Sequence, residues 1–110
     1  MNGMERLLMR FGVTPNYTGF RQVLEAVREA EGRPESLLQV SKRLYPAVAG
    51  RCGTTWKAVE RNIRAMAAIA WQNDPALLCD LAGRRLECCP KSAQFIAILA
   101  ASAEKSGKEP

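Results

Sequence analysis

The sequence predicts an all-α fold, a compact bundle of about six helices that contains a helix-turn-helix. Three observations predict it. Apolar residues recur at helical spacing along nearly the whole chain, and no stretch shows the sustained alternation of a strand. Glycines and prolines divide that pattern into short segments. With 110 residues, 47% of them apolar, the chain fits a single helical domain spanning residues 1–110, large enough to fold without a metal or a disulfide.

The first two helices are predicted from their apolar stripes and their stop signals. Leu7, Leu8 and Phe11 indicate a short helix that Gly12 and Pro15 end. The second helix runs to Gly32 and Pro34, and its stripe follows the i, i+3, i+4, i+7 spacing of an amphipathic helix: Phe20, Val23, Leu24, Val27 and Ala30.

A third helical stretch is expected to begin at Ser36 and to contain a bend. It carries the apolar residues Leu37, Leu38, Val40 and Leu44, and Pro46 lies within it. Because proline lacks an amide donor and disfavours a helical residue before it, we expect the chain to bend at Tyr45 and to restart. The restarted piece has Val48 and Ala49 on its inner side and ends at Gly53.

The longest helical pattern follows Thr54 and Thr55, both good N-caps, and extends to about Trp71. Its expected buried side consists of Val59, Ile63, Met66, Ala67, Ile69 and Ala70.

The last third of the chain predicts two more helices. Asp74 is expected to cap a short helix that has Pro75 at its first position and ends at Gly83. Residues 84–91, RRLECCPK, form a connection that is partly extended. Ser92 is expected to cap the last helix, and the tail at about 103–110 to fray.

The positive charge is concentrated in one central segment. Residues 42–64 contain six basic residues and the single acid Glu60, and they account for the whole net charge of +5. The six are Lys42, Arg43, Arg51, Lys57, Arg61 and Arg64. A concentrated basic face attracts polyanions such as nucleic acid. The alternative is a solvated helical surface that happens to be basic, although such surfaces usually mix charge signs.

The same segment has the spacing of a helix-turn-helix, over about residues 46–72. Ala49 is small where a second helix would cross, Gly53 suits a turn residue with positive φ, and Val59 and Ile63 would hold the second helix down. The exposed face near the start of the second helix then consists of Thr55, Trp56, Lys57, Glu60, Arg61 and Arg64. Proteins with this motif place that face in the major groove.

Several other classes of function find little support. The chain has no histidine, which removes Ser-His-Asp and Cys-His catalysis and His-bearing zinc sites, and we expect no enzyme and no cofactor. Its four cysteines form no Cys-x-x-Cys pair, so we expect no metal site. A redox role for Cys88 and Cys89 is a minor alternative, because nearby cations lower a thiol pKa. No apolar run reaches the ~20 residues of a membrane span and no signal peptide is evident, so the expected location is the cytoplasm.

Over about residues 4–101 the chain also resembles a known family, the C-terminal DNA-binding effector domain of the sporulation initiation transcription factor. The matching segments are GVTPNYTGF, LYPAVA, TTWKAVERNIRAMAAIAW and QFIAILA, in the family's order and with similar spacing. The resemblance implies a six-helix fold, a double-stranded DNA target, and a role at RNA polymerase. It also implies binding to tandem DNA boxes as adjacent domains, and hence a homodimer or tandem arrangement on DNA.

The residue roles follow from this resemblance together with side-chain chemistry. Arg61 is assigned to base reading, because a guanidinium can donate two parallel hydrogen bonds to guanine. Glu60 could accept from cytosine or orient Arg61. Lys57 and Trp56 complete the base-reading set, although Trp56 could instead be half-buried and silent. The expected phosphate contacts are Thr54, Thr55, Arg64, Arg51, Lys42 and Arg43.

Three departures from the family bear on these expectations. Trp56 and Lys57 replace the family's small residues, so the target sequence is expected to differ. The connection RRLECCPK is shorter than the family's, and in the family this region touches the sigma subunit of RNA polymerase. The phosphate-accepting receiver domain that normally precedes the module is not in this sequence. The alternative function is a helical interaction module that binds a sigma factor or a regulator without reading DNA.

Overall fold

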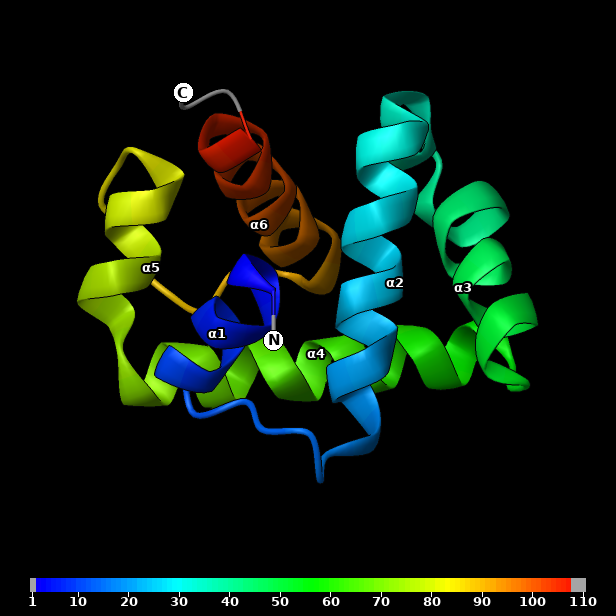
Figure 1. The fold of residues 1–110 in the computed structure, drawn as a ribbon, viewed down its shortest axis with the longest axis horizontal. Helices are drawn as coiled ribbons and strands as arrows, with labels where there is room; N and C mark the ends of the chain where they lie inside the picture. Colours follow the sequence, from blue (N-terminus) through cyan, green and yellow to red (C-terminus); the bar gives the residue numbers. More distant parts are fainter. Residues whose placement is uncertain (1, 108–110) are drawn as a thin grey trace.

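Six α-helices make up most of the chain in a computed structural model, which describes the backbone of residues 2–107 and the side chains of residues 2–103 (Figure 1). They are α1 (Gly3–Arg10), α2 (Thr18–Gly32), α3 (Tyr45–Cys52), α4 (Trp56–Asn73), α5 (Pro75–Ala82) and α6 (Ser92–Gly107). Two irregular helical segments, η1 (Pro34–Leu38) and η2 (Val40–Leu44), connect α2 to α3. Residues 2–107 contain no strand, which confirms the all-α prediction.

Three helix ends carry clear capping contacts, and the two that belong to α5 lie at the predicted residues. The Glu5 amide donates to Asn2 Oδ1 at 2.8 Å and the Asn2 amide donates to Glu5 Oε1 at 2.9 Å, a reciprocal cap that begins α1. At α5, the Leu77 amide donates to Asp74 Oδ1 at 3.0 Å, and Pro75 occupies the first helical position. Gly83, with φ +73°, ends α5 as predicted.

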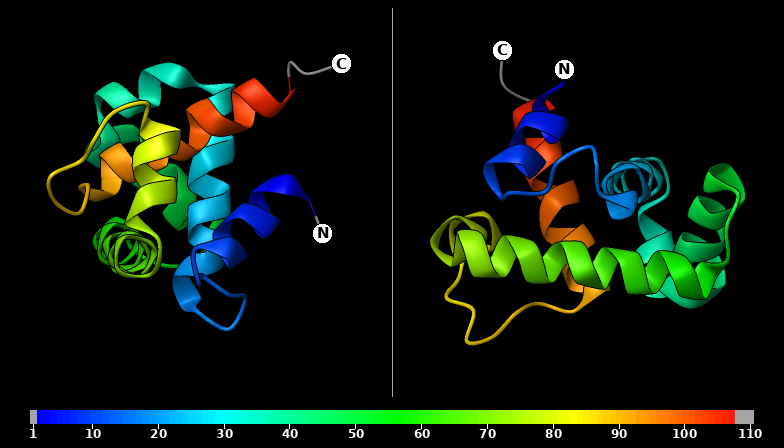
Figure 2. Two further views of the ribbon diagram at one scale, coloured as in Figure 1. Left: turned by 90° about the vertical axis from the view of Figure 1, so that its left-hand side faces the viewer. Right: turned by 90° about the horizontal axis from the view of Figure 1, so that it is seen from below.

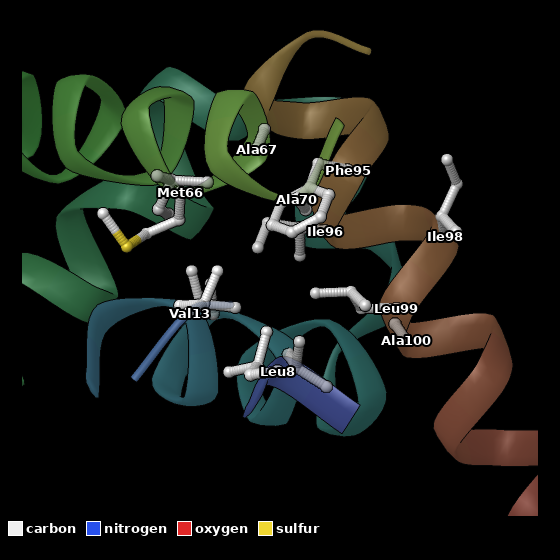
Figure 3. Close-up of a cluster of buried hydrophobic side chains, with 14 of the residues drawn as sticks. Leu8, Val13, Met66, Ala67, Ala70, Phe95, Ile96, Ile98, Leu99 and Ala100 are labelled. Atoms are coloured by element: carbon white, nitrogen blue, oxygen red, sulfur yellow. The ribbon is translucent and has the colours of Figure 1, made fainter. Parts of the chain in front are cut away.

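Helix α4 lies along one side of the molecule, and the others are arranged around it (Figure 2, right). Helices α2 and α6 pack on its inner side, while α3 and α5 contact its opposite ends (Figure 1). The buried side chains where these helices meet form one core (Figure 3), and the predicted stripes of α2 and α4 contribute to it.

Helices α2 and α4 cross closely at Gly19. A Cβ atom there would lie 2.6 Å from Met66 Cγ and 2.9 Å from the backbone oxygen of Asn62. Beside it, Asn62 Nδ2 donates to Oε1 of the buried Gln22 at 3.1 Å. The missing side chain of Gly19 therefore sets how closely the two helices approach.

The region before α3 differs from the prediction. Instead of an α-helix from Ser36 with a bend at Pro46, the chain forms the 3-10 segment η1 and the π-helical segment η2, and α3 begins at Tyr45. Tyr45 itself is helical, with φ −65° and ψ −40°, and Pro46 lies in the first turn of α3, where its missing amide costs no hydrogen bond. Leu38, assigned to the apolar stripe, is 84% exposed because the irregular segment turns it outward.

The cap predicted at Ser92 was also wrong. Ser92 is the first residue of α6, and its hydroxyl binds two side chains of other helices, described below. Helix α6 continues through Gly107, so it includes part of the tail for which we expected fraying; residues 108–110 lie outside the described residues. Within the described part of the chain, no helix is long and apolar enough to span a membrane.

Candidate nucleic-acid interface

A tight turn at Gly53 joins α3 to α4 in a helix-turn-helix arrangement. Gly53 has φ +66°, the left-handed conformation that a side chain would strain. The amides of Gly53 and Thr54 both donate to the carbonyl oxygen of Ala49, the latter at 3.1 Å, which ends α3. Val59 and Ile63 are fully buried and hold α4 against the rest of the domain. The predicted small, turn and anchoring residues therefore occupy their expected places.

The N-terminus of α4 is open to solvent beside this turn. Thr55 is its N-cap, and its Oγ1 accepts a hydrogen bond from the Ala58 amide at 3.2 Å. Thr54 and Thr55 are both exposed. An exposed helix N-terminus of this kind presents amides and a positive dipole end, which favour an anion such as a phosphate.

One face of α4 carries exposed large side chains over its first two turns. Trp56 is 39% exposed, and Lys57 Nζ lies 5.8 Å from the centroid of its ring, a cation–π contact. Lys57, Arg61 and Arg64 follow at helical spacing and are all exposed. Arg61 makes no ion pair or side-chain hydrogen bond with any other described residue, so its guanidinium is available to a ligand.

Glu60 is turned toward the protein rather than toward Arg61. Its Oε2 accepts a hydrogen bond from Ser92 Oγ at 3.0 Å, and its Oε1 lies 3.6 Å from Arg64 Nη1. The buried hydroxyl of Tyr45 lies 2.9 Å from Ser92 Oγ and extends the network to α3. Burial raises the pKa of Tyr45, and the nearby Glu60 charge adds to that shift. Of the two roles considered for Glu60, orienting Arg61 is not seen, and Glu60 contacts Arg64 instead.

Arg51 pairs with acids of α2. Its Nη2 donates to Glu29 Oε1 at 2.7 Å, and its Nη1 lies 3.7 Å from Glu25 Oε2. Glu29 is buried, so Arg51 compensates a carboxylate inside the fold. The charge count over residues 42–64 missed this pairing because both acids lie outside that segment.

Lys42 and Arg43 lie on η2, before the helix-turn-helix. Both are exposed, and Arg43 Nε donates to Gln39 Oε1 at 3.2 Å. The length of α3, about 12 Å for eight residues, separates them from the α3–α4 turn.

The four cysteines were considered for a metal site and, at Cys88 and Cys89, for a redox role. All four thiols are free, and no group of three metal-ligating side chains occurs among the described residues. Burial raises the pKa of Cys89, and the neighbouring Cys88 raises it further. This direction is opposite to the thiol activation on which the redox alternative depends.

Three buried polar residues that join neighbouring helices, two of them to α4 and one to α3, were not recognised in the sequence. Gln22, Glu29 and Ser92 are buried and bind Asn62, Arg51 and Glu60, respectively. In the sequence, these contacts were indicated only by the polar residues Gln22 and Glu29 on the apolar face of a helix. Such a residue does not reveal a hydrogen-bonding partner that lies many residues away.

A comparison with protein families matches residues 4–103 to the family described as "Sporulation initiation factor Spo0A C terminal". The match covers nearly the whole chain, including every helix that forms the core and the α3–α4 turn. The chain therefore belongs to this family of DNA-binding regulatory domains, as its four matching segments indicated.

Proposed function

We propose that the protein is a sequence-specific regulator of transcription that inserts the N-terminal half of α4 into the major groove of double-stranded DNA. The observation that carries the proposal is the exposed face of Lys57, Arg61 and Arg64 directly after the Gly53 turn, in a chain of a DNA-binding family. An α-helix fits the major groove, and helix-turn-helix proteins place the start of their second helix against base edges.

Arg61 is the proposed principal base reader. It is exposed, it has no described partner to lose, and it lies one turn after Lys57 on the same face. Bidentate donation to guanine O6 and N7 is the commonest specific contact of arginine. Lys57 and Trp56 flank it and would contact neighbouring bases, with the cation–π pair limiting the motion of both side chains.

Arg64 and the N-terminus of α4 are the proposed phosphate contacts. Glu60 holds Arg64, and Ser92 in turn holds Glu60, so the guanidinium is oriented before DNA binds. We therefore assign Glu60 to positioning Arg64 and remove it from the base-reading set. Thr54 and Thr55 would bind a phosphate through their hydroxyls and the nearby amides.

The remaining basic residues divide into two groups. Lys42 and Arg43 would contact phosphate only if the DNA extends along α3, whereas Arg51 compensates Glu29 and leaves the proposed phosphate set. A cytoplasmic location, tandem or dimeric binding, and a contact between the 84–91 connection and the sigma subunit remain proposals that rest on the family resemblance.

The test begins with selection of bound sequences from a random DNA pool, followed by titration of the selected site over a salt series. A protein that contacts three or four phosphates should lose affinity with a log–log slope of roughly −3 to −4. Arg61→Ala should cost about 1–3 kcal/mol, chiefly at one base pair, and relax specificity there. Arg64→Ala should weaken all sequences alike and reduce the slope by about 1.

Arg84→Ala is the matched control, because it removes an exposed arginine that follows α5 and belongs to neither helix of the helix-turn-helix. It should leave the sequence preference unchanged. A selected site whose affinity and specificity survive Arg61→Ala would refute the assignment of that residue. Binding that ignores sequence and salt would instead favour the alternative, an interaction module that does not read DNA.

A further inference from the structure

A groove of about 680 Å³ lies between α1, α2, α5 and α6. Its apolar lining consists of Val27 of α2, Ala103 of α6 and five larger side chains: Met4 and Leu7 of α1, Leu24 of α2, and Leu77 and Leu81 of α5. All five pack against the core on one side yet stay only partly buried, because their other sides line the groove. Four helices thus contribute to one concave apolar surface.

Arginines dominate the rim of this groove. Arg6 and Arg10 lie one turn apart on α1, Arg28 lies on α2, and Glu31 is the acidic residue of the lining. All three arginines are exposed, and Arg28 Nη1 also pairs with Glu25 at 3.3 Å. The rim is therefore net positive around an apolar floor.

We propose that this groove binds an acidic amphipathic helix of a partner protein. A helix with apolar residues at i, i+3, i+4 and i+7 would place them on the leucine floor, and its flanking carboxylates would meet the rim arginines. The apolar floor favours a protein over a nucleic acid, because phosphates and sugars gain nothing from contact with leucine side chains.

The groove is separate from the proposed DNA interface. Among the residues whose side chains are described, none that lines the groove belongs to α3 or α4. Helices α3 and α5 lie at opposite ends of α4 (Figure 1), so the groove can be filled while the first turns of α4 contact DNA. The partner would thus join a DNA-bound domain without competing for DNA, and the inference stands independently of the proposed base contacts.

The test uses a synthetic helical peptide of about fifteen residues, with leucines at the four positions given above and glutamates on the flanks. Binding is followed by anisotropy of the labelled peptide and by amide NMR shifts of the protein. The expected shifts are centred on Leu7, Leu24 and Leu77. The double variant R6E/R10E should weaken binding about tenfold, because it converts two attractive rim contacts into repulsive ones.

R84E/R85E is the matched control, since it changes net charge equally but lies outside the groove. It should change peptide affinity by less than about twofold, in line with screening of distant charges. Both double variants should bind DNA alike, which separates failure of this proposal from failure of the DNA proposal. The groove assignment would be overturned if the peptide caused no amide NMR shifts at the groove residues, or if both double variants weakened peptide binding equally. It would also be overturned if polyglutamate, or the same peptide with lysines on its flanks, bound as tightly as the acidic peptide.

Discussion

Substituting alanine for Gly19 tests whether the approach of α2 to α4 determines the stability of the domain. Two opposing effects are expected. Alanine in a helix interior gains about 0.4–1 kcal/mol over glycine by restricting the unfolded chain, and this is an upper limit for Gly19, the second residue of α2. Against this, the new Cβ would lie 2.6 Å from Met66 Cγ and 2.9 Å from the Asn62 carbonyl oxygen. The flexible end of Met66 can move, but the Asn62 oxygen belongs to the backbone of α4, so the helices must separate.

Overpacking of this kind costs about 1–3 kcal/mol, which exceeds the gain. We therefore expect Gly19→Ala to lower the free energy of unfolding by about 1 kcal/mol or more, measured by urea denaturation. Gly50→Ala is the matched control, because Gly50 is also helical and a Cβ there meets nothing within 4 Å. It should raise stability by about 0.5–1 kcal/mol. A Gly19→Ala protein as stable as Gly50→Ala would refute the proposed role of the close approach.

Three further predictions concern polar contacts. Thr55→Ala removes the hydroxyl that accepts from the Ala58 amide, so it should lower the free energy of unfolding by about 1 kcal/mol in urea denaturation. Thr55→Ser keeps the hydroxyl and should be near neutral. Equal losses of stability in the two variants would contradict the role of Thr55 as a cap. Arg51→Ala leaves the buried Glu29 carboxylate with the longer 3.9 Å contact to Arg33. It should therefore lower the free energy of unfolding by about 1–2 kcal/mol. Its DNA affinity should fall less than that of Arg64→Ala. The pKa of Tyr45 is raised in the folded state, so the tyrosine hydroxyl loses its proton at a lower pH in the unfolded chain than in the folded one. Deprotonation therefore favours the unfolded chain, and stability falls as the pH rises above about 10. Tyr45→Phe should make this alkaline loss shallower in a pH series of unfolding curves, and an unchanged slope would contradict it.

The sequence predicted the elements that local rules determine. The apolar stripes of α2 and α4, the Asp74–Pro75 start of α5, and the left-handed glycines at positions 53 and 83 all lie where they were expected. Each depends on residues within about one or two turns of each other, so periodicity and capping chemistry are enough.

The errors arose where tertiary contacts override local preference. Pro46 does not bend a helix because η2 already delivers the chain to the first turn of α3, and Tyr45 stays helical with its hydroxyl fixed by Ser92. Ser92 itself is an attractive cap by composition, but a bond to Glu60, 32 residues away, takes its hydroxyl. Neither the helical Tyr45 nor the partner of Ser92 can be predicted from a short segment of the sequence.

The same reasoning explains the mixed result for the basic segment. The exposure of Arg61 followed from helical spacing, because Val59 and Ile63 had to face inward. The role of Arg51 could not follow, since its partners lie on α2, 22 and 26 residues earlier in the chain. A local charge count treats both arginines as equal, whereas the fold makes one available and neutralises the other.

The length of α4 has a mechanical consequence. Its last residue, Asn73, donates from Nδ2 to the Phe11 carbonyl oxygen at 3.1 Å and so is tied to the loop that follows α1. Its first residue, Trp56, lies 17 residues earlier, about 25 Å away. A tilt of about 5° pivoting at Asn73 would move the Trp56 end sideways by about 2 Å, several times the range of about 0.5 Å over which a hydrogen-bond distance varies. A small shift of the loop at residues 11–17 would thereby produce a larger displacement at the N-terminal end of α4.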